Sequence, residues 1–262
     1  MTDVTVVSLN IRGIPLAGSR LVARCRAIGA FFEASDADVV CMQEVATYAH
    51  MGLLARRMRS FRHVSLSRTV PGPAGDVVTF SRLPVAATAF HRYGPVTAPI
   101  PRLARFRGRL KGALVTTLER PAIAVVNTHP LANTDGDWSP SNRFYRAHRA
   151  QLAALAKAVG SVSLPTVVCG DFNIDRDSAL FSEFAGQTML ADVFDGKCPP
   201  TFRAEYLPVG RRPCCIDFIL TKGEVKVSAA DVVLAGEQPM RGGPGYVSDH
   251  VGLLARLHVF DG

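Results

Sequence analysis

Apolar residues along the chain recur with two periods, one typical of strands and one typical of helices. Short runs rich in valine and other β-branched residues predict strands. The predicted strand regions are 4–10, 36–45, 76–85, 112–118, 122–130, 166–174, 215–220, 230–236 and 251–260. Only "ERP" separates 112–118 from 122–130, which predicts a hairpin.

Three segments have apolar residues at helical spacing. In 20–32, Leu21, Cys25, Ile28 and Phe32 form one face, with Ser19 as the expected cap. Segment 51–58 is the second predicted helix. The third runs from about 140 to 159, entered through Ser139 and Pro140. Its apolar stripe contains Phe144, His148, Leu152, Leu155 and Val159.

The order of these elements predicts an α/β fold. Strands outnumber helices and some are hairpin neighbours, which argues against a purely parallel sheet. Two mixed sheets packed face to face, with helices on the outer faces, accommodate every predicted element. At 262 residues, we expect a single domain over 1–262.

Composition places the chain among globular proteins, with 48% hydrophobic and 20% charged residues. The six cysteines form no CxxC pair, and Cys41 and Cys169 lie in predicted strands as core thiols. No signal peptide is visible, and no apolar run reaches the length of about 18 residues that a membrane span needs. We expect a soluble, reduced, cytoplasmic monomer.

Positive charge is concentrated in one region. Lysine and arginine number 30 against 22 acidic residues, and no acidic residue occurs between Val77 and Leu118. That stretch contains Arg82, Arg92, Arg102, Arg105, Arg107, Arg109 and Lys111. Such a region favours anions, whether phosphate esters, nucleic acid or an acidic membrane surface. The alternative is an arginine-rich face that is simply solvated.

Polar residues recur at the ends of the predicted strands. They are Asn10, Gln43, Glu44, His129, Asp171, Asn173, Asp217, Asp249 and His250. Strand ends on one edge of a layered sheet form a common rim, so these residues can converge. Four of these features have an ordinary alternative: "SDH" at 248–250 as a turn, "GDFN" at 170–173 as an Asx turn, Glu44 after Gln43 as a helix cap, and His129 as a loop histidine.

The converged set has the composition of a metal-dependent hydrolytic site. Carboxylate and amide oxygens suit Mg²⁺ or Mn²⁺. No hydroxyl or thiol is placed as a nucleophile, so the expected reaction is attack of water on a phosphoester. The two imidazoles can stabilise the phosphoryl charge or protonate the leaving oxygen.

The motifs "SLNIRG", "CMQEV", "NTHP", "GDFNID", "CIDFIL" and "SDH" resemble, in order, those of the endonuclease/exonuclease/phosphatase superfamily. The resemblance covers 4–259 and implies a four-layer α/β/β/α sandwich with metal-dependent phosphoesterase activity. Within the superfamily the chain looks most similar to neutral sphingomyelinases, through "NIRGIP", "GDVVTFSRLPV", "FRGRLKGALV" and "YRAHRAQLAALAKAV".

The resemblance implies a role for each site residue. Glu44 becomes the principal metal ligand with Asn10 beside it, and Asp249 binds metal directly or through water. Asp171 orients or deprotonates the attacking water, and Asn173 holds the phosphate or that water. His129 contacts the phosphoryl oxygens, and His250 is a second catalytic imidazole oriented by Asp217. Lys111 touches the phosphate.

Three functions follow from these observations. The first is a Mg²⁺-dependent phosphodiesterase of phospholipase C type, cutting sphingomyelin or a related phospholipid. The second is a nuclease, nucleotide phosphohydrolase or phosphatase of the same superfamily, which the basic stretch favours. The third is a binding module that kept only the fold. Arg12 stands where the sphingomyelinases carry an aromatic residue, so the head-group preference stays open.

Overall fold

The computed structural model describes residues 1–13 and 18–260, and these residues form two six-stranded sheets. The first sheet has the order β11-β12-β1-β2-β4-β3. Its strands are β1 (Thr2–Asn10), β2 (Val39–Gln43), β3 (His63–Ser65), β4 (Val78–Ser81), β11 (Val225–Val233) and β12 (Gly252–Val259). β1 and β2 are parallel, and β12 runs antiparallel to β1, so the sheet is mixed.

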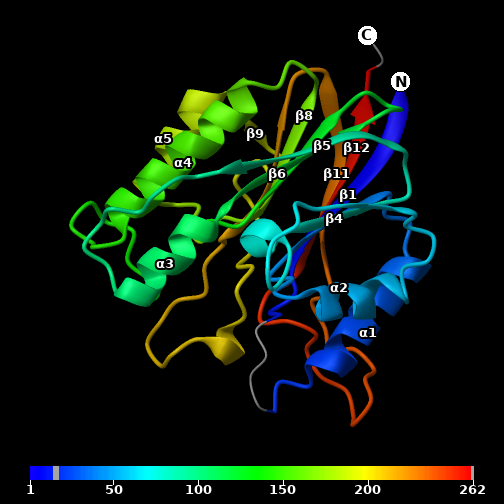
Figure 1. The fold of residues 1–262 in the computed structure, drawn as a ribbon, viewed down its shortest axis with the longest axis horizontal. Helices are drawn as coiled ribbons and strands as arrows, with labels where there is room; N and C mark the ends of the chain where they lie inside the picture. Colours follow the sequence, from blue (N-terminus) through cyan, green and yellow to red (C-terminus); the bar gives the residue numbers. More distant parts are fainter. Residues whose placement is uncertain (14–17, 261–262) are drawn as a thin grey trace.

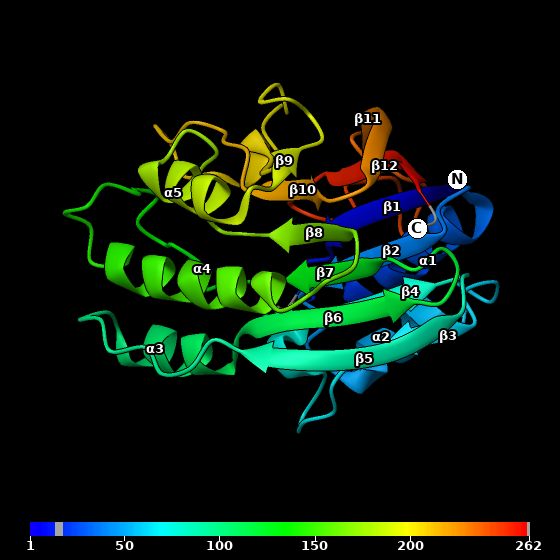
Figure 2. The ribbon, with the colours of Figure 1, turned by 90° about the horizontal axis from the view of Figure 1, so that it is seen from above.

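The second sheet has the order β5-β6-β7-β8-β10-β9. Its strands are β5 (Val85–Arg92), β6 (Gly112–Leu118), β7 (Ala124–Thr128), β8 (Thr166–Asp171), β9 (Ala191–Asp192) and β10 (Asp217–Lys222). β6 and β7 form the predicted hairpin, while β7 and β8 are parallel. Figure 2 shows β5 to β8 side by side.

Helices cover the outer face of each sheet (Figure 1). α1 (Leu21–Ala34) and α2 (Tyr48–Ala55) pack on the first sheet, and α4 (Tyr145–Gly160) and α5 (Ala179–Thr188) pack on the second. α3 (Arg102–Leu110) joins β5 to β6, and two short 3₁₀ turns lie at Ala74–Asp76 and Ala204–Tyr206. The predicted four-layer α/β/β/α sandwich is confirmed.

Alternation along the strands explains both the core and the position of the polar residues. Side chains of a strand point alternately to its two faces. In β8, Val167 and Cys169 are buried between the sheets and Val168 packs against the helix layer. The next position with the same orientation as Cys169 is Asp171. An inward-facing apolar series that ends in a carboxylate therefore places that carboxylate at the rim of the inter-sheet space.

A buried pair of amides joins the two sheets beneath this rim. Gln43 donates from Nε2 to Oδ1 of Asn127 at 2.9 Å, and Asn127 donates from Nδ2 to the carbonyls of Met42 and Val78. Neither side chain is exposed to solvent. Polar groups this deeply buried are costly unless paired, so these bonds specify one alignment of β2 against β7.

Several boundaries differ from the sequence prediction, including that of β11, which covers Val225–Val233 rather than 230–236. Segment 76–85 contains the end of the Ala74–Asp76 turn, β4 and the first residue of β5, and the chain passes from one sheet to the other within it. α1 is not capped by Ser19, because Arg20 is the N-cap residue in a left-handed conformation. α4 begins at Tyr145 rather than near Pro140, and α2 begins at Tyr48, where the Thr47 hydroxyl accepts from the amide of His50.

β3, β5, β9, α3 and α5 are not among the predicted elements. Most residues of β5 are exposed because it is an edge strand, so its sequence lacks a buried apolar run. Ser139 and Pro140 predict helix in the segment before α4. It instead forms side-chain-capped turns, in which Asp137 accepts from the amide of Ser139 and Asn142 accepts from that of Phe144.

Candidate active site

The carboxylate of Asp171 lies at the centre of the polar rim. Its Oδ1 accepts from the amide of Asn173 at 2.9 Å, and its Oδ2 accepts from Nδ2 of Asn10 at 2.9 Å. The preceding Gly170 lets β8 approach β7, since a Cβ atom there would lie 1.9 Å from the carbonyl oxygen of Thr128. The predicted Asx turn is therefore real, and it holds the carboxylate in place.

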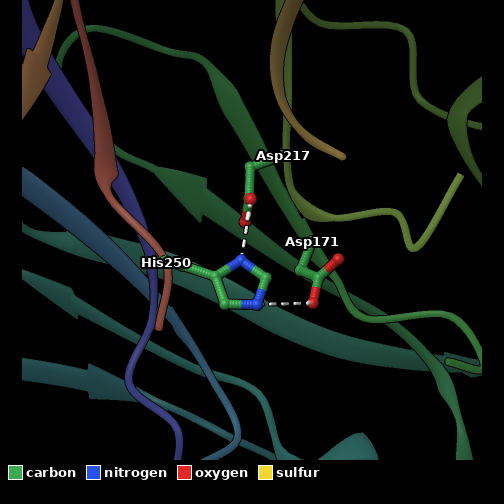
Figure 3. Close-up of side chains that lie close together, drawn as sticks. All are labelled: Asp171, Asp217 and His250. Carbon is green, nitrogen blue, oxygen red and sulfur yellow. Dashed lines mark hydrogen bonds and ion pairs between the residues drawn. The ribbon is translucent and has the colours of Figure 1, made fainter. Parts of the chain in front are cut away.

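Two imidazoles face Asp171 with their Nε2 atoms. Nε2 of His129 lies 3.7 Å from Oδ2 of Asp171, and Nε2 of His250 lies 3.8 Å from the same oxygen. Figure 3 shows His250 between Asp171 and Asp217. These distances exceed a hydrogen bond, so neither Nε2 atom is hydrogen-bonded to Asp171.

His250 is held from behind by Asp217. Its Nδ1 lies 2.8 Å from Oδ2 of Asp217, whose side chain is 1% exposed. The hydroxyl of Thr201 accepts from the backbone amide of Asp217 and fixes the start of β10. Burial opposes a charged imidazole, but the carboxylates of Asp217 and Asp171 outweigh it and raise the pKa of His250 to about 10. His250 is therefore a cation at neutral pH.

His129 is held from behind by Asp76 and Lys111. Its Nδ1 lies 2.8 Å from Oδ1 of Asp76 and 2.8 Å from Nζ of Lys111, and the ammonium also lies 3.0 Å from each Asp76 oxygen. Burial opposes ionisation of Asp76, but Lys111 and His129 outweigh it and lower its pKa to about 2. Asp76 is therefore ionised over the whole physiological range.

Glu44 lies beside this centre with one carboxylate oxygen free. Oε1 accepts from Nδ2 of Asn10 at 3.3 Å, while Oε2 is buried without a partner among the described residues. Burial raises the pKa of Glu44. The residue adopts a left-handed backbone with φ of 59°, and Gly13 permits it, because a Cβ there would lie 1.8 Å from the Glu44 carbonyl oxygen. Such conformations persist where surrounding contacts enforce them.

Asp249 and Arg12 form the outer side of the site. Oδ2 of Asp249 lies 3.2 Å from Nε of Arg12, and the guanidinium stacks over the ring of Tyr206, 4.5 Å from its centroid. Oδ1 of Asp249 lies 4.0 Å from Nε2 of His250. The "SDH" segment is also a turn, since the hydroxyl of Ser248 accepts from the amide of His250 and donates to the Asn10 carbonyl.

The sequence profile of the Endonuclease/Exonuclease/phosphatase family matches residues 7–250, which include every residue of this site. The chain belongs to this family. Members of the family are hydrolases that act on phosphoester bonds. No curated protein sequence matches the chain significantly.

Solved structures of several proteins share the fold. SmcL superposes with a TM-score of 0.76 at 14% identity, covering 98% of this chain and 99% of the other. TDP2 of D. rerio, in complex with a single-strand DNA product, superposes with a TM-score of 0.75 at 16% identity, covering 99% and 100%. The beta toxin of Staphylococcus aureus gives 0.74 at 16%, covering 98% and 100%. Identities this low establish the fold alone.

The donor atoms of the site fit the divalent cation that the family uses. Glu44 has a buried oxygen without a partner, and a carboxylate so placed suits a hard cation. Asp171, Asp217 and His250 also have ligand atoms within 4.8 Å of one another. In that group, however, Nδ1 of His250 and Oδ2 of Asp217 are already bonded to each other. The Glu44 side of the site is therefore the better position for a cation.

The structure brings the predicted rim residues, apart from Gln43, into one contact network. Three details refine their expected roles. Asn10 presents its Nδ2 to both carboxylates, and its Oδ1 accepts from the amide of Arg12. Asn173 donates from its side chain to the Pro130 carbonyl. Gln43 lies beneath the rim and pairs with Asn127, so it does not face the site. Ile14 and Pro15 of the "NIRGIP" motif lie outside the described residues.

Asp76 is the site residue that the sequence analysis missed. It lies in the quoted motif "GDVVTFSRLPV", directly before the stretch without acidic residues. It ends a 3₁₀ turn with φ of 56° rather than a strand, so the rule of strand ends did not include it. The nearest available signal was its position as the last carboxylate before a long basic region.

Proposed function

We propose that this protein is a divalent-metal-dependent phosphodiesterase of phospholipase C type, with a phospholipid head group as the preferred substrate. The observation that carries the hydrolytic function is the convergence of two imidazole Nε2 atoms on the Asp171 carboxylate. Each imidazole is held at Nδ1 by a separate aspartate. This arrangement supports both proton removal from water and stabilisation of a phosphoryl group.

The residues divide the reaction among them. Asp171 accepts the proton of the attacking water, whose oxygen forms the new bond to phosphorus. Nε2 of His250, which is cationic, donates to a phosphoryl oxygen and stabilises the charge that develops there. Nε2 of His129 donates a proton to the leaving oxygen as the ester bond breaks. Asp217 and Asp76 orient the two rings through Nδ1.

Glu44 is the proposed principal ligand of Mg²⁺ or Mn²⁺, with Asn10 and Asp249 beside it. For Asn10 to bind the cation, its side-chain amide must turn so that the oxygen rather than Nδ2 faces the cation. Asp249 would bind the cation directly or through water. A bound divalent cation supplies Lewis acidity to the phosphoryl oxygens and lowers the pKa of water. Asn173 is proposed to contact the phosphate. Lys111, whose Nζ lies 2.8 Å from Nδ1 of His129 and 3.0 Å from each Asp76 oxygen, is proposed to act on the phosphate through His129.

A lipid head group is the preferred substrate because the chain's subfamily motifs resemble those of neutral sphingomyelinases. The second candidate is a nuclease or a phosphatase acting on nucleotides. It is favoured by the formal net charge of +8 and by the shared fold with TDP2, which was solved with a single-strand DNA product.

The decisive experiment compares hydrolysis of sphingomyelin, lysophosphatidylcholine, a nitrophenyl phosphodiester, a nitrophenyl monoester and abasic DNA. Each is measured with Mg²⁺, with Mn²⁺ and with EDTA. Glu44→Gln tests the proposed ligand, and Asp231→Asn, an exposed aspartate on β11, is the matched control. We expect phosphodiester hydrolysis that EDTA abolishes, that Glu44→Gln lowers at limiting metal, and that Asp231→Asn leaves unchanged.

The outcomes separate the chemistry from the substrate. Hydrolysis that persists in EDTA overturns the metal-dependent mechanism. Cleavage of DNA alone, falling steeply with salt, overturns the lipid preference and leaves the mechanism standing. Hydrolysis of the monoester alone would show that the protein is a phosphatase and not the proposed phosphodiesterase.

A further inference from the structure

α3 is held against the protein by its small residues. Ala104 and Gly108, four residues apart, lie on the side that faces the body of the protein. The carbonyl of Gly108 accepts from Nε2 of Gln151 on α4 at 3.0 Å, and a Cβ atom on Gly108 would lie 2.7 Å from the Val96 side chain. The side of α3 with Ala104 and Gly108 therefore packs against the protein, and the opposite side faces outward.

The large apolar residues of α3 lie on that outward face. Leu103 is 61% exposed, Phe106 is 60% exposed and Leu110 is 44% exposed. Their spacing of three and four residues puts them within about 60° of one another around the helix axis. The helix thus exposes one continuous apolar stripe and buries its small residues, the reverse of an ordinary surface helix.

Arginines flank this stripe on both sides. Arg107 lies along one side, and Arg102 and Arg109 lie along the other, with Arg105 nearer the protein. Among residues 1–13 and 18–260, none of these four guanidinium groups has an ion-pair partner. The helix belongs to the stretch from Val77 to Leu118 that contains no acidic residue. Arg82 is different, because it donates to backbone carbonyls of Phe32, Glu33 and Ser35.

We propose that α3 docks this protein on the surface of an anionic lipid bilayer. Helices that lie in a membrane interface combine an apolar stripe, which enters the acyl boundary, with flanking basic residues, which contact anionic head groups. Nucleic acid would use the arginines but would leave the central leucines and phenylalanine without a partner. No helix of the described residues is long and apolar enough to cross a membrane.

Docking through α3 would bring the candidate active site to the bilayer. The last residue of α3, Leu110, is followed directly by Lys111, which lies 2.8 Å from His129. Figure 2 shows α3 beyond the arrowhead end of β5, where β6 begins. The proposal concerns binding and holds without the proposed phosphodiesterase; if both hold, the helix orients the site toward a lipid substrate.

The test is co-sedimentation of the full chain with phosphatidylcholine vesicles, with and without phosphatidylserine. One variant, Leu103→Ser/Phe106→Ser/Leu110→Ser, removes the stripe. A second, Arg102→Gln/Arg107→Gln/Arg109→Gln, removes the charge. The matched controls are Arg56→Gln/Arg57→Gln/Arg59→Gln, which removes three exposed arginines elsewhere, and Val22→Ser/Val209→Ser, which removes exposed apolar residues elsewhere. Circular dichroism checks that each variant is folded.

We expect binding that requires phosphatidylserine. Each α3 variant should weaken it by at least about tenfold, because the arginines contact anionic head groups and the apolar stripe enters the acyl boundary. Both controls should bind like the wild type. Asp171→Asn protein should also bind, which separates docking from catalysis. Binding that is absent, that ignores phosphatidylserine, or that the controls weaken equally overturns the proposal. A single-strand DNA oligonucleotide is titrated in parallel, and loss on DNA with unchanged vesicle binding assigns the arginines to nucleic acid instead.

Discussion

The two imidazoles of the site have nearly the same geometry but different surroundings. Each has an aspartate 2.8 Å from Nδ1 and shares the Asp171 oxygen at its Nε2, at 3.7 Å for His129 and 3.8 Å for His250. One aspartate, Asp217, is 1% exposed, while the other, Asp76, is 30% exposed and also binds Lys111. We call the pair of Asp217 and His250 one arm of the site and the pair of Asp76 and His129 the other. The two arms have the same geometry but different electrostatic environments.

The difference shows how one arrangement can serve two tasks. In the His250 arm, the carboxylates of Asp217, Asp171 and Asp249 act on one imidazole, so the pKa of the imidazole rises to about 10. In the His129 arm, the ammonium of Lys111 shares the carboxylate of Asp76, whose pKa falls to about 2. An imidazole with a raised pKa suits charge stabilisation, which leaves the other imidazole for proton transfer to the leaving oxygen.

The largest expected effect comes from the residue that both arms share. Asp171→Asn removes the proton acceptor between the two imidazoles while preserving its size, so kcat should fall by about 10³-fold or more. Steady-state kinetics on a nitrophenyl phosphodiester measure the fall, with Asp231→Asn as control. Activity within tenfold of the wild type would mean that neither arm acts through Asp171.

The next effect separates the arms. Asp217→Asn leaves the His250 ring without its buried counter-charge and can impose the wrong tautomer, so kcat should fall by about 10²-fold. The same kinetics measure it, and the pH dependence of kcat should shift because the pKa of His250 is no longer raised by this carboxylate. A fall in kcat of about 10²-fold without a shift in its pH dependence would indicate that the variant has lost structure, rather than that the His250 ring has lost its orientation.

Asp76→Asn should have a smaller effect on catalysis, about tenfold, because Asp76 is 30% exposed, so the amide oxygen of asparagine or a water molecule can accept from Nδ1 of His129 in its place. Comparing kcat of Asp76→Asn with kcat of Asp217→Asn shows which arm contributes more to catalysis. The asymmetry between them is contradicted if Asp76→Asn is the more damaging change.

The smallest effect is on stability in acid. Asp76 has a folded-state pKa of about 2, below its ordinary value of 3.8, so it stabilises the fold above pH 4 and loses this contribution as the pH falls toward 2. Between pH 5 and pH 3 the wild type should lose about 1 kcal/mol through this group. Urea unfolding in EDTA measures the slope, which should be shallower in Asp76→Asn and unchanged in Asp231→Asn. If the free energy of unfolding falls equally with pH in the wild type, Asp76→Asn and Asp231→Asn, Asp76 does not contribute to the loss of stability in acid.

The sequence predicted the layers and most of the rim because both follow from strand alternation. An inward-facing series such as Val167, Cys169 and Asp171 is readable without coordinates. Asp76 is not readable in this way, since it approaches His129 from a 3₁₀ turn and makes its contacts across 53 residues of sequence.

α3 escaped prediction for a related physical reason. A helix is expected to bury its large apolar residues, and this one buries Ala104 and Gly108 and exposes Leu103 and Phe106. Periodicity alone gives the stripe but not the side of the helix that meets the protein. The support from Gln151 decides that side, and it depends on tertiary packing.

The amide pair of Gln43 and Asn127 has a consequence for the whole site. The rim takes residues from both sheets, so its geometry is only as precise as the translation of one sheet over the other. Apolar surfaces can slide with little directional penalty, whereas a hydrogen bond of 2.9 Å between two buried amides cannot. This hydrogen bond therefore fixes the position of one sheet relative to the other. Core mutations elsewhere can change the packing between the sheets while the two halves of the site stay aligned.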